Sequence, residues 1–256
     1  MDDRSLKVLF YADDGVVVAG NEDAVQCLLY KMKISAEKFN MSISINKTQS
    51  MVISKNPIRC KLAVDSGIIQ QVSRFNYLET NISCERNLLE EARTQSIKAS
   101  RVSGYLRDIV WRNKAMSSQS KTRIYKTCVR PILTYASETR AETSKTKSIM
   151  RTTEMKILRT IKGVTLRDRI RSDIRAELGV QDVVRWVRTR KRFSRDLVER
   201  MPEDRWAKWA KNQKPNKRRP VGKPPKRWYV RELEFSIGGR SQKRAKCTGL
   251  NRTWSY

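Results

Sequence analysis

Short blocks of apolar residues, separated by turn-forming residues, run through the first 75 positions of the chain. In residues 5–19, two apolar runs flank Asp13-Asp14-Gly15, a combination typical of a β-hairpin. Residues 22–39 carry apolar side chains at helical spacing, and Asn21 can cap that helix at its N-terminus. This pattern predicts a hairpin followed by a helix.

Two further segments complete the predicted α/β part. Residues 41–53 alternate between apolar and polar positions and predict two short strands. Residues 60–73 predict a small hairpin that turns at Asp65-Ser66-Gly67. The first 75 residues are therefore expected to mix α and β structure.

The pattern becomes helical after Tyr77, where apolar side chains recur every three or four positions. The predicted helices cover residues 87–112, 117–139, 145–162, 167–178 and 181–200. Pro131 should kink the second of them, because it lacks the amide hydrogen and crowds the preceding turn. Gly163 is a natural end for the third. We therefore predict an α+β protein that is mostly helical, with its strands confined to the N-terminal part.

The charge of the chain narrows its class of partner. The formal net charge is +29, and no apolar run approaches the ~20 residues that a membrane helix needs. Counted along the sequence, residues 1–55 hold 7 basic and 7 acidic residues, residues 56–200 hold 32 and 15, and residues 201–256 hold 16 and 4. A surface this positive attracts polyanions, so nucleic acid is the first candidate partner and an anionic membrane surface the second.

The cysteine and histidine content and the N-terminal residues disfavour a zinc site, a disulfide framework and secretion. The chain has five cysteines, none with a partner at zinc-ligand spacing, and no histidine. These residues exclude a Cys/His zinc knuckle and disfavour a framework of disulfide bonds. The first residues, MDDRSLK, lack the basic start of a signal peptide. An intracellular protein is therefore expected, and a nuclear location stays open.

The acidic pair Asp13-Asp14 is the candidate catalytic and metal-binding centre. Two adjacent carboxylates at a hairpin tip supply the oxygen ligands that Mg²⁺ prefers, and such ions clamp phosphates in nucleotidyl transfer. A small residue such as Ala12 leaves room for a primer end, and Tyr11 can pack beneath it. The alternative interpretation is an ordinary turn, for which Asp-Asp-Gly is common chemistry.

Further segments follow this pair in a fixed order. They are ISINKTQSMVIS (43–54), FNYLETNIS (75–83), RIYKTCVRPILTYASET (123–139), RTIKGVTLRDRIRSDIRAELGV (159–180) and GKPPKRW (222–228). Together with Tyr11-Ala12-Asp13-Asp14, they resemble, in order and spacing, the C-terminal part of the reverse transcriptase of a non-LTR (LINE-type) retrotransposon.

The resemblance implies both an organisation and an activity. It implies a partial polymerase palm over residues 1–75, a helical thumb over 76–165, a basic helical region over 166–210 and a basic Pro-rich arm over 211–256. The family is an RNA-directed DNA polymerase that uses Mg²⁺, with Mn²⁺ as an alternative. It binds an RNA template and a DNA primer, or their RNA–DNA hybrid. Lys47 matches the palm lysine near the incoming nucleotide, beside Tyr11 and Ala12.

The chain also departs from the family's pattern. The family usually has Gly at the position of Glu79 and Trp at that of Arg140, and a late His is absent here, which suggests relaxed selection. The family's fingers and first metal-binding Asp precede the hairpin, in sequence that this chain does not contain. We therefore expect the chain to lack polymerase activity on its own.

Basic residues of the helical part and of the arm are the candidate nucleic-acid contacts, although a charged helix face is often only a solvated face. The candidates are Arg123, Lys126, Arg130, Lys217, Arg218, Arg219, Lys226 and Arg227. Trp228 and Tyr229 could stack on unpaired bases, and the same run could be a nuclear-localisation signal. Trp206 and Trp209 are interpreted as core or interface anchors.

Three hypotheses remain open on the sequence. The chain is part of a reverse transcriptase, or a non-enzymatic nucleic-acid-binding protein derived from the thumb and arm, or a decayed reading frame without a stable product. The last would expose unpaired strand edges in its partial palm and would aggregate.

Overall fold

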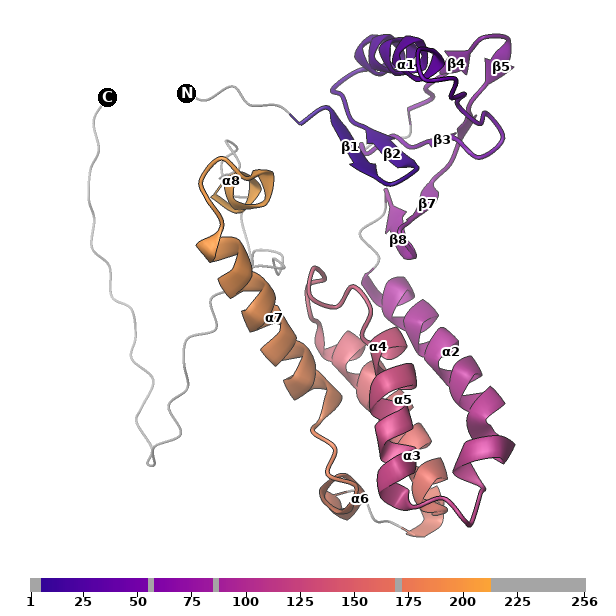
Figure 1. Cartoon of the computed structure of the whole chain (residues 1–256), viewed down its shortest axis with the longest axis vertical. Coiled ribbons are helices and arrows are strands. Elements are labelled where there is room, and N and C mark those ends of the chain that lie inside the picture. Colours follow the sequence, from indigo (N-terminus) through magenta and orange to yellow (C-terminus); the bar gives the residue numbers. More distant parts are fainter. Residues whose placement is uncertain (1–5, 55–57, 85–87, 169–171, 213–256) are drawn as a thin grey trace, which may run out of the picture.

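The computed structural model of the chain describes residues 6–54, 58–84, 88–168 and 172–212. Figure 1 shows the strands and helix α1 grouped at one end and helices α2 to α7 grouped at the other, with β7 and β8 between the two groups. The fold is mixed α+β and mostly helical, as predicted. Among the described residues, seventeen buried apolar residues form the core of the helical group, whereas four form the core of the strand-containing group.

All sheets among the described residues are two-stranded. The strands are β1 (Val8–Tyr11), β2 (Asp14–Val17), β3 (Gln49–Ser50), β4 (Ala63–Val64), β5 (Gly67–Ile68), β6 (Gln70–Gln71), β7 (Arg74–Tyr77) and β8 (Thr80–Ser83). Three pairs are antiparallel hairpins, β1–β2, β4–β5 and β7–β8, and β3 pairs with β6 in parallel. Both predicted hairpins are therefore present, and β7–β8 is an additional one.

The prediction of two strands in residues 41–53 is wrong for most of that segment, where only Gln49–Ser50 is a strand. The Ser44 carbonyl accepts hydrogen bonds from the Thr48 amide at 2.9 Å and the Thr48 hydroxyl at 2.8 Å, which closes a local turn. Ile45 lies against Gly67, where an added Cβ would come within 2.7 Å of Ile45 Cδ1. The alternation of apolar residues thus reflects packing on the small core and not pairing in a sheet.

Helix α1 (Glu22–Glu37) organises the small core. Asn21 caps it, because its side-chain oxygen accepts a hydrogen bond of 2.8 Å from the Ala24 amide. Leu29 on this helix is buried with three residues from the β4–β5 region. Gln26 fixes the contact, since its side chain donates to the Ala63 carbonyl at 2.8 Å and accepts from the Ala63 amide at 3.0 Å.

The helical group contains most of the predicted helices, with some of them divided. Its elements are α2 (Leu88–Leu106), the π-helix Arg107–Trp111, α3 (Ser118–Ile124), the π-helix Tyr125–Val129, α4 (Arg130–Leu133), α5 (Ser144–Lys162), the 3₁₀-helix Leu166–Asp168, α6 (Ser172–Glu177), α7 (Val183–Arg200) and α8 (Trp206–Asn212). The predicted helix over 117–139 is interrupted by the π-helix just before Pro131. The backbone hydrogen-bond pattern must change there, because proline has no amide hydrogen to donate. Gly163 ends α5 with φ +77°, as predicted.

One buried carboxylate joins the helices of this group. Glu154 on α5 is 0% exposed. Its Oε1 accepts hydrogen bonds from Tyr125 Oη at 2.9 Å and Arg130 Nη2 at 3.2 Å. Its Oε2 accepts from Arg175 Nη2 at 2.8 Å and from the Val183 amide, at the start of α7, at 3.1 Å. A single side chain therefore connects α5 to the second π-helix, α4, α6 and α7.

The hairpin β7–β8 connects the two groups. Its turn residues Leu78 and Glu79 both have positive φ, 47° and 61°, a conformation that costs side-chain-bearing residues energy. Side chains of the helical group hold this turn in place: Tyr135, in the turn after α4, donates from its Oη to the Leu78 carbonyl at 2.8 Å, and Gln95 of α2 donates from its Nε2 to the Glu79 carbonyl at 3.2 Å. The boundary expected at residue 75 falls within this hairpin.

We predict that Glu154→Gln lowers the free energy of unfolding by about 3 to 5 kcal/mol, because it leaves buried cations and donors without their acceptor. Urea denaturation followed by circular dichroism measures the loss. The matched control is Glu177→Gln, which breaks the exposed ion pair with Lys162 and should cost less than about 1 kcal/mol. Equal losses for the two variants would contradict the central role of Glu154.

We predict that Glu79→Gly is more stable than Glu79→Ala by about 1 kcal/mol, because only glycine adopts the positive φ of this turn without strain. Both variants lose the exposed ion pair between Glu79 and Lys98, so their difference reports the backbone alone. Thermal or urea unfolding of the two variants checks the prediction. Identical midpoints would show that the turn carries no strain.

Candidate functional site

The acidic hairpin turns at Ala12 and Asp13, one residue earlier than predicted. Tyr11 pairs with Asp14 across the strands, so the loop has two residues and Asp14 already belongs to β2. Ala12 has φ +49°, the sign that a two-residue hairpin requires at its first position. The tight loop thus places both acidic residues at the tip of the hairpin, Asp13 in the loop and Asp14 at the start of β2.

Gly15 lets the hairpin pack on helix α1. It pairs with Phe10, and a Cβ on Gly15 would lie 2.9 Å from Phe10 Cε1 and 3.2 Å from Met32 Cε. The Phe10 ring and the Met32 methyl group thus occupy the space that a side chain would take. Because side chains alternate along a strand, Tyr11 and Asp14 share the opposite face of the hairpin, away from this contact.

Asp13 and Asp14 are both exposed, and neither has a hydrogen bond or ion pair within the described part of the chain. Their oxygen atoms suit a hard divalent cation such as Mg²⁺. No third Asp, Glu, His or Cys joins them in a group that could hold a metal, within the ranges that the structure describes. The donor set is therefore right in kind and incomplete in number.

Lys47 lies in the turn that follows Ser44 and is exposed. Within the described ranges, no hydrogen bond or ion pair joins it to the hairpin. Tyr11, Ala12, Asp13 and Asp14 are brought together by the hairpin itself, and Lys47 is positioned by a separate local turn.

The predicted nucleic-acid contacts of the helical part divide into two kinds. Arg123 and Lys126 are exposed, and the Lys126 ammonium donates to the Gly179 carbonyl at 2.8 Å. The prediction for Arg130 is wrong, because this residue is only 4% exposed. Its Nη2 donates to Glu154 and, at 2.8 Å, to the Gln181 carbonyl, so its charge is used within the fold.

The predicted contacts of the arm, Lys217, Arg218, Arg219, Lys226 and Arg227, lie outside the described residues, as do Trp228 and Tyr229.

Arg140, where the resemblance leads one to expect Trp, occupies a buried position between α4 and α5. It is 8% exposed, and its two terminal nitrogens have no hydrogen-bond partner among the described atoms. Burial lowers the pKa of its guanidinium, and the nearby carboxylates of Glu91, Glu142 and Glu138 partly offset that effect. A buried cation without direct acceptors is costly, which fits a position suited to an aromatic ring.

The two tryptophans of α8 do not form a core. They contact each other edge to face with ring centroids 5.3 Å apart, but Trp206 is 42% exposed and α8 has no buried residue. Of the two predicted roles, core anchor or interface anchor, the core role is therefore wrong for Trp206, and the interface role stays a prediction.

Comparison with known proteins gives one distant relative. Over 234 residues, the chain is 25% identical to a transposon-derived protein of Caenorhabditis elegans, and the alignment covers 88% of this chain and 83% of the relative. The chain is a distant relative of a transposon-derived protein. No protein-family model matches it, and no solved structure matches it. Among the described residues, no helix has both the length and the apolar character to cross a membrane.

Proposed function

We propose that the chain is the hairpin-and-thumb portion of a non-LTR retrotransposon reverse transcriptase, and that it binds the RNA–DNA hybrid of template and primer. The observation that carries this proposal is the exposed tip of the β1–β2 hairpin, where Asp13 and Asp14 form no ion pair with any residue that the structure describes. The distant similarity to a transposon-derived protein supports the same origin.

In this proposal the two carboxylates hold Mg²⁺, which supplies the charge that binds and orients nucleotide phosphates. Tyr11 and Asp14 share the hairpin face turned away from α1, so the metal side of the hairpin stays open to a nucleic-acid end. A complete polymerase centre needs a further carboxylate, and the described residues place none beside the pair.

That shortage favours a second candidate function, a nucleic-acid-binding protein without catalysis. The exposed cations of the helical part would then be the functional feature, and the acidic hairpin would be inherited without use. Both candidates predict that the chain binds nucleic acid and does not synthesise DNA on its own, and they differ in whether the hairpin carboxylates bind Mg²⁺.

We predict that the chain binds an RNA–DNA hybrid with an affinity that falls steeply with salt, because neutralised phosphates release counterions. Replacing Arg123 and Lys126 together by Ala should reduce the slope of log affinity against log salt by about 1 to 2. Fluorescence anisotropy across a salt series measures it.

The matched control for this experiment is the double replacement of Arg59 and Lys61, two exposed cations of the strand-containing group, by Ala. It removes the same charge from a different surface and should leave the slope less affected. A salt-independent affinity would contradict the proposed binding to the phosphate backbone.

We predict no processive DNA synthesis by the chain alone with Mg²⁺, nucleotides and a primed RNA template, because the carboxylate pair lacks a third partner among the described residues. Primer extension on a denaturing gel tests this. Asp13→Asn should leave hybrid affinity within about twofold of the parent. Robust synthesis that Asp13→Asn abolishes would show that the centre is complete and would exclude the non-catalytic candidate.

A further inference from the structure

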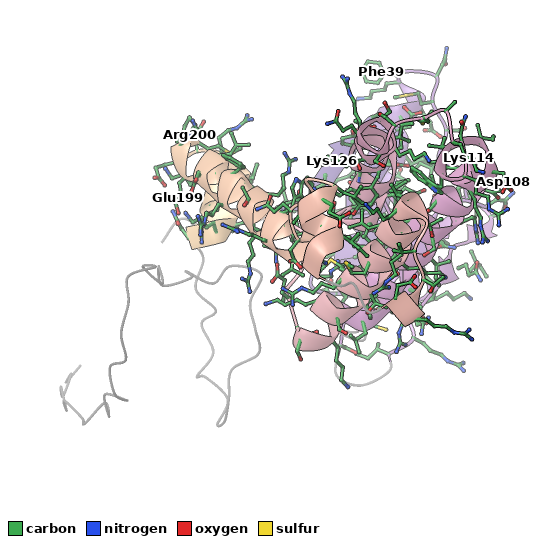
Figure 2. All side chains as sticks on the ribbon, turned by 90° about the horizontal axis from the view of Figure 1, so that it is seen from below. Phe39, Asp108, Lys114, Lys126, Glu199 and Arg200 are labelled. Carbon is green, nitrogen blue, oxygen red and sulfur yellow. The ribbon has the colours of Figure 1, made fainter. Side chains whose placement is uncertain are left out.

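Helix α7 changes character along its length. Its first two turns pack on the bundle, where Val183, Val184 and Val187 are 0% exposed. Its last turns contain no buried residue, and Phe193 and Leu197, four positions apart on one face, are 63% and 53% exposed. Figure 2 shows Glu199 and Arg200 at the far end of α7, where the helix extends away from the bundle. The end of α7 is thus a protruding surface with apolar side chains.

A tight elbow joins this end to α8. The Met201 amide donates to the Val198 carbonyl at 3.3 Å, and the Arg205 amide donates to the Pro202 carbonyl at 3.2 Å. Ion pairs then hold α8 against the elbow: Lys211 lies 2.7 Å from Glu199, and Lys208 lies 2.8 Å from Glu203. These contacts use Glu199 and Glu203, two of the four acidic residues in residues 183–212.

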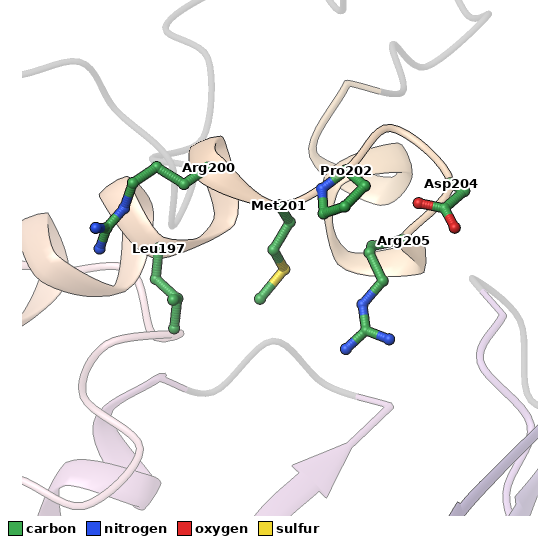
Figure 3. A pocket seen from close by; sticks show the side chains of 6 residues that line it. All are labelled: Leu197, Arg200, Met201, Pro202, Asp204 and Arg205. Atoms are coloured by element: carbon green, nitrogen blue, oxygen red, sulfur yellow. The ribbon is translucent and has the colours of Figure 1, made fainter.

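An open hollow of about 670 Å³ lies at the elbow. It is lined by Leu197, Arg200, Met201, Pro202, Asp204 and Arg205. Figure 3 shows the side chains of Leu197, Met201 and Arg205 extending to the same side of the chain. The hollow therefore combines apolar walls with charged groups at its margin.

The charged groups of the hollow form no ion pair within the described residues, and Arg200 Nε donates to the Asp196 carbonyl at 3.3 Å. No carboxylate among the described residues pairs with Arg200 or Arg205, and Asp204 has no hydrogen bond or ion pair there. Residues 183–212 contain ten basic and four acidic residues, so the surroundings are positive. One carboxylate and two guanidinium groups that line the same hollow in a positive surface suit a ligand that is anionic overall and carries hydrogen-bond donors.

We propose that this hollow binds one unpaired base of a single-stranded nucleic acid, with guanine preferred. Leu197 and Met201 would cover the faces of the base, and Arg200 and Arg205 would contact the phosphates on either side. Asp204 would accept hydrogen bonds from the base edge, as carboxylates do from the exocyclic amino groups of bases. Guanine offers two adjacent donors on that edge and thymine only one, which sets the preference.

Exposed aromatic side chains extend the same surface. Trp206 begins α8 directly after Arg205, and Phe193 lies one helical turn before Leu197. Aromatic rings next to arginines give stacking positions for neighbouring bases. A polyanion without rings would leave these apolar groups unused, so the composition favours nucleic acid over an acidic polypeptide.

This inference deepens the proposed function, because it names a second form of nucleic acid and its site. The hybrid-binding surface was assigned to Arg123 and Lys126, and the hollow lies on different elements. The two assignments can therefore fail independently.

The test is a pair of labelled single-stranded oligonucleotides of equal length, one of thymidine only and one of alternating guanosine and thymidine, bound to the full chain at one salt concentration. We expect the guanine-containing strand to bind about fivefold more tightly, the lower end of the range for a specific base contact at an open site. Asp204→Asn should reduce this preference to about onefold, without weakening the binding of the thymidine strand.

The matched control is Asp196→Asn, which removes the same charge from an exposed position of α7 that does not line the hollow. It should keep the preference. Because non-specific attraction by the basic surface acts on both strands equally, the ratio of affinities isolates the hollow.

The outcomes separate the two assignments. An equal affinity for both strands, or a preference that survives Asp204→Asn, overturns the base site while hybrid binding can still stand. A preference that Asp204→Asn removes supports the base site even if the hybrid does not bind.

Discussion

The burial of Glu154 is the constraint on which the helical half depends. A carboxylate at 0% exposure is stable only when its oxygens are fully engaged, and here two arginines, a tyrosine hydroxyl and a backbone amide engage them. Each donor comes from a different part of the chain between residues 125 and 183. The positions of α4, α6 and the start of α7 relative to α5 are therefore fixed together, and none can shift without uncovering a buried charge.

The strand-containing half, in contrast, buries little apolar surface. Its core has four buried residues, and its two-stranded sheets have unpaired edges within the described ranges. Its junction with the helical half adds stability, because side chains from α2 and from the segment after α4 donate hydrogen bonds to the β7–β8 turn. The acidic hairpin thus belongs to a small strand-containing group that contacts the helical bundle on one side. The hairpin face with the carboxylates stays exposed.

Local signals were readable from the sequence, and partners distant in the sequence were not. The cap at Asn21, the stop at Gly163 and the hairpin at Ala12–Asp13 each depend on a few adjacent residues, and those predictions are confirmed or shifted by one position. The strands predicted in 41–53 failed because periodicity cannot tell pairing in a sheet from packing of Ile45 over Gly67. The burial of Arg130 depends on Glu154, 24 positions away. The signal that could have revealed it is a lone acid among the apolar positions of a basic helix, between Met150 and Leu158.

This pairing also changes what a net charge of +29 means. Arg130 and Arg175 neutralise a buried acid, and Arg151 contacts Asp182, the residue that caps α7. Burial raises the pKa of the Asp182 carboxyl, but hydrogen bonds from Arg151 and the Arg185 amide outweigh it and hold that pKa below its ordinary value. Cations near the core thus serve the fold and are unavailable to a polyanion. The charge that is left for nucleic acid lies at the periphery, at positions such as Arg123, Arg200 and Arg205, where no carboxylate of the described chain competes for it. The net charge therefore indicates the class of partner, and the ion pairs of the fold decide which surfaces can meet it.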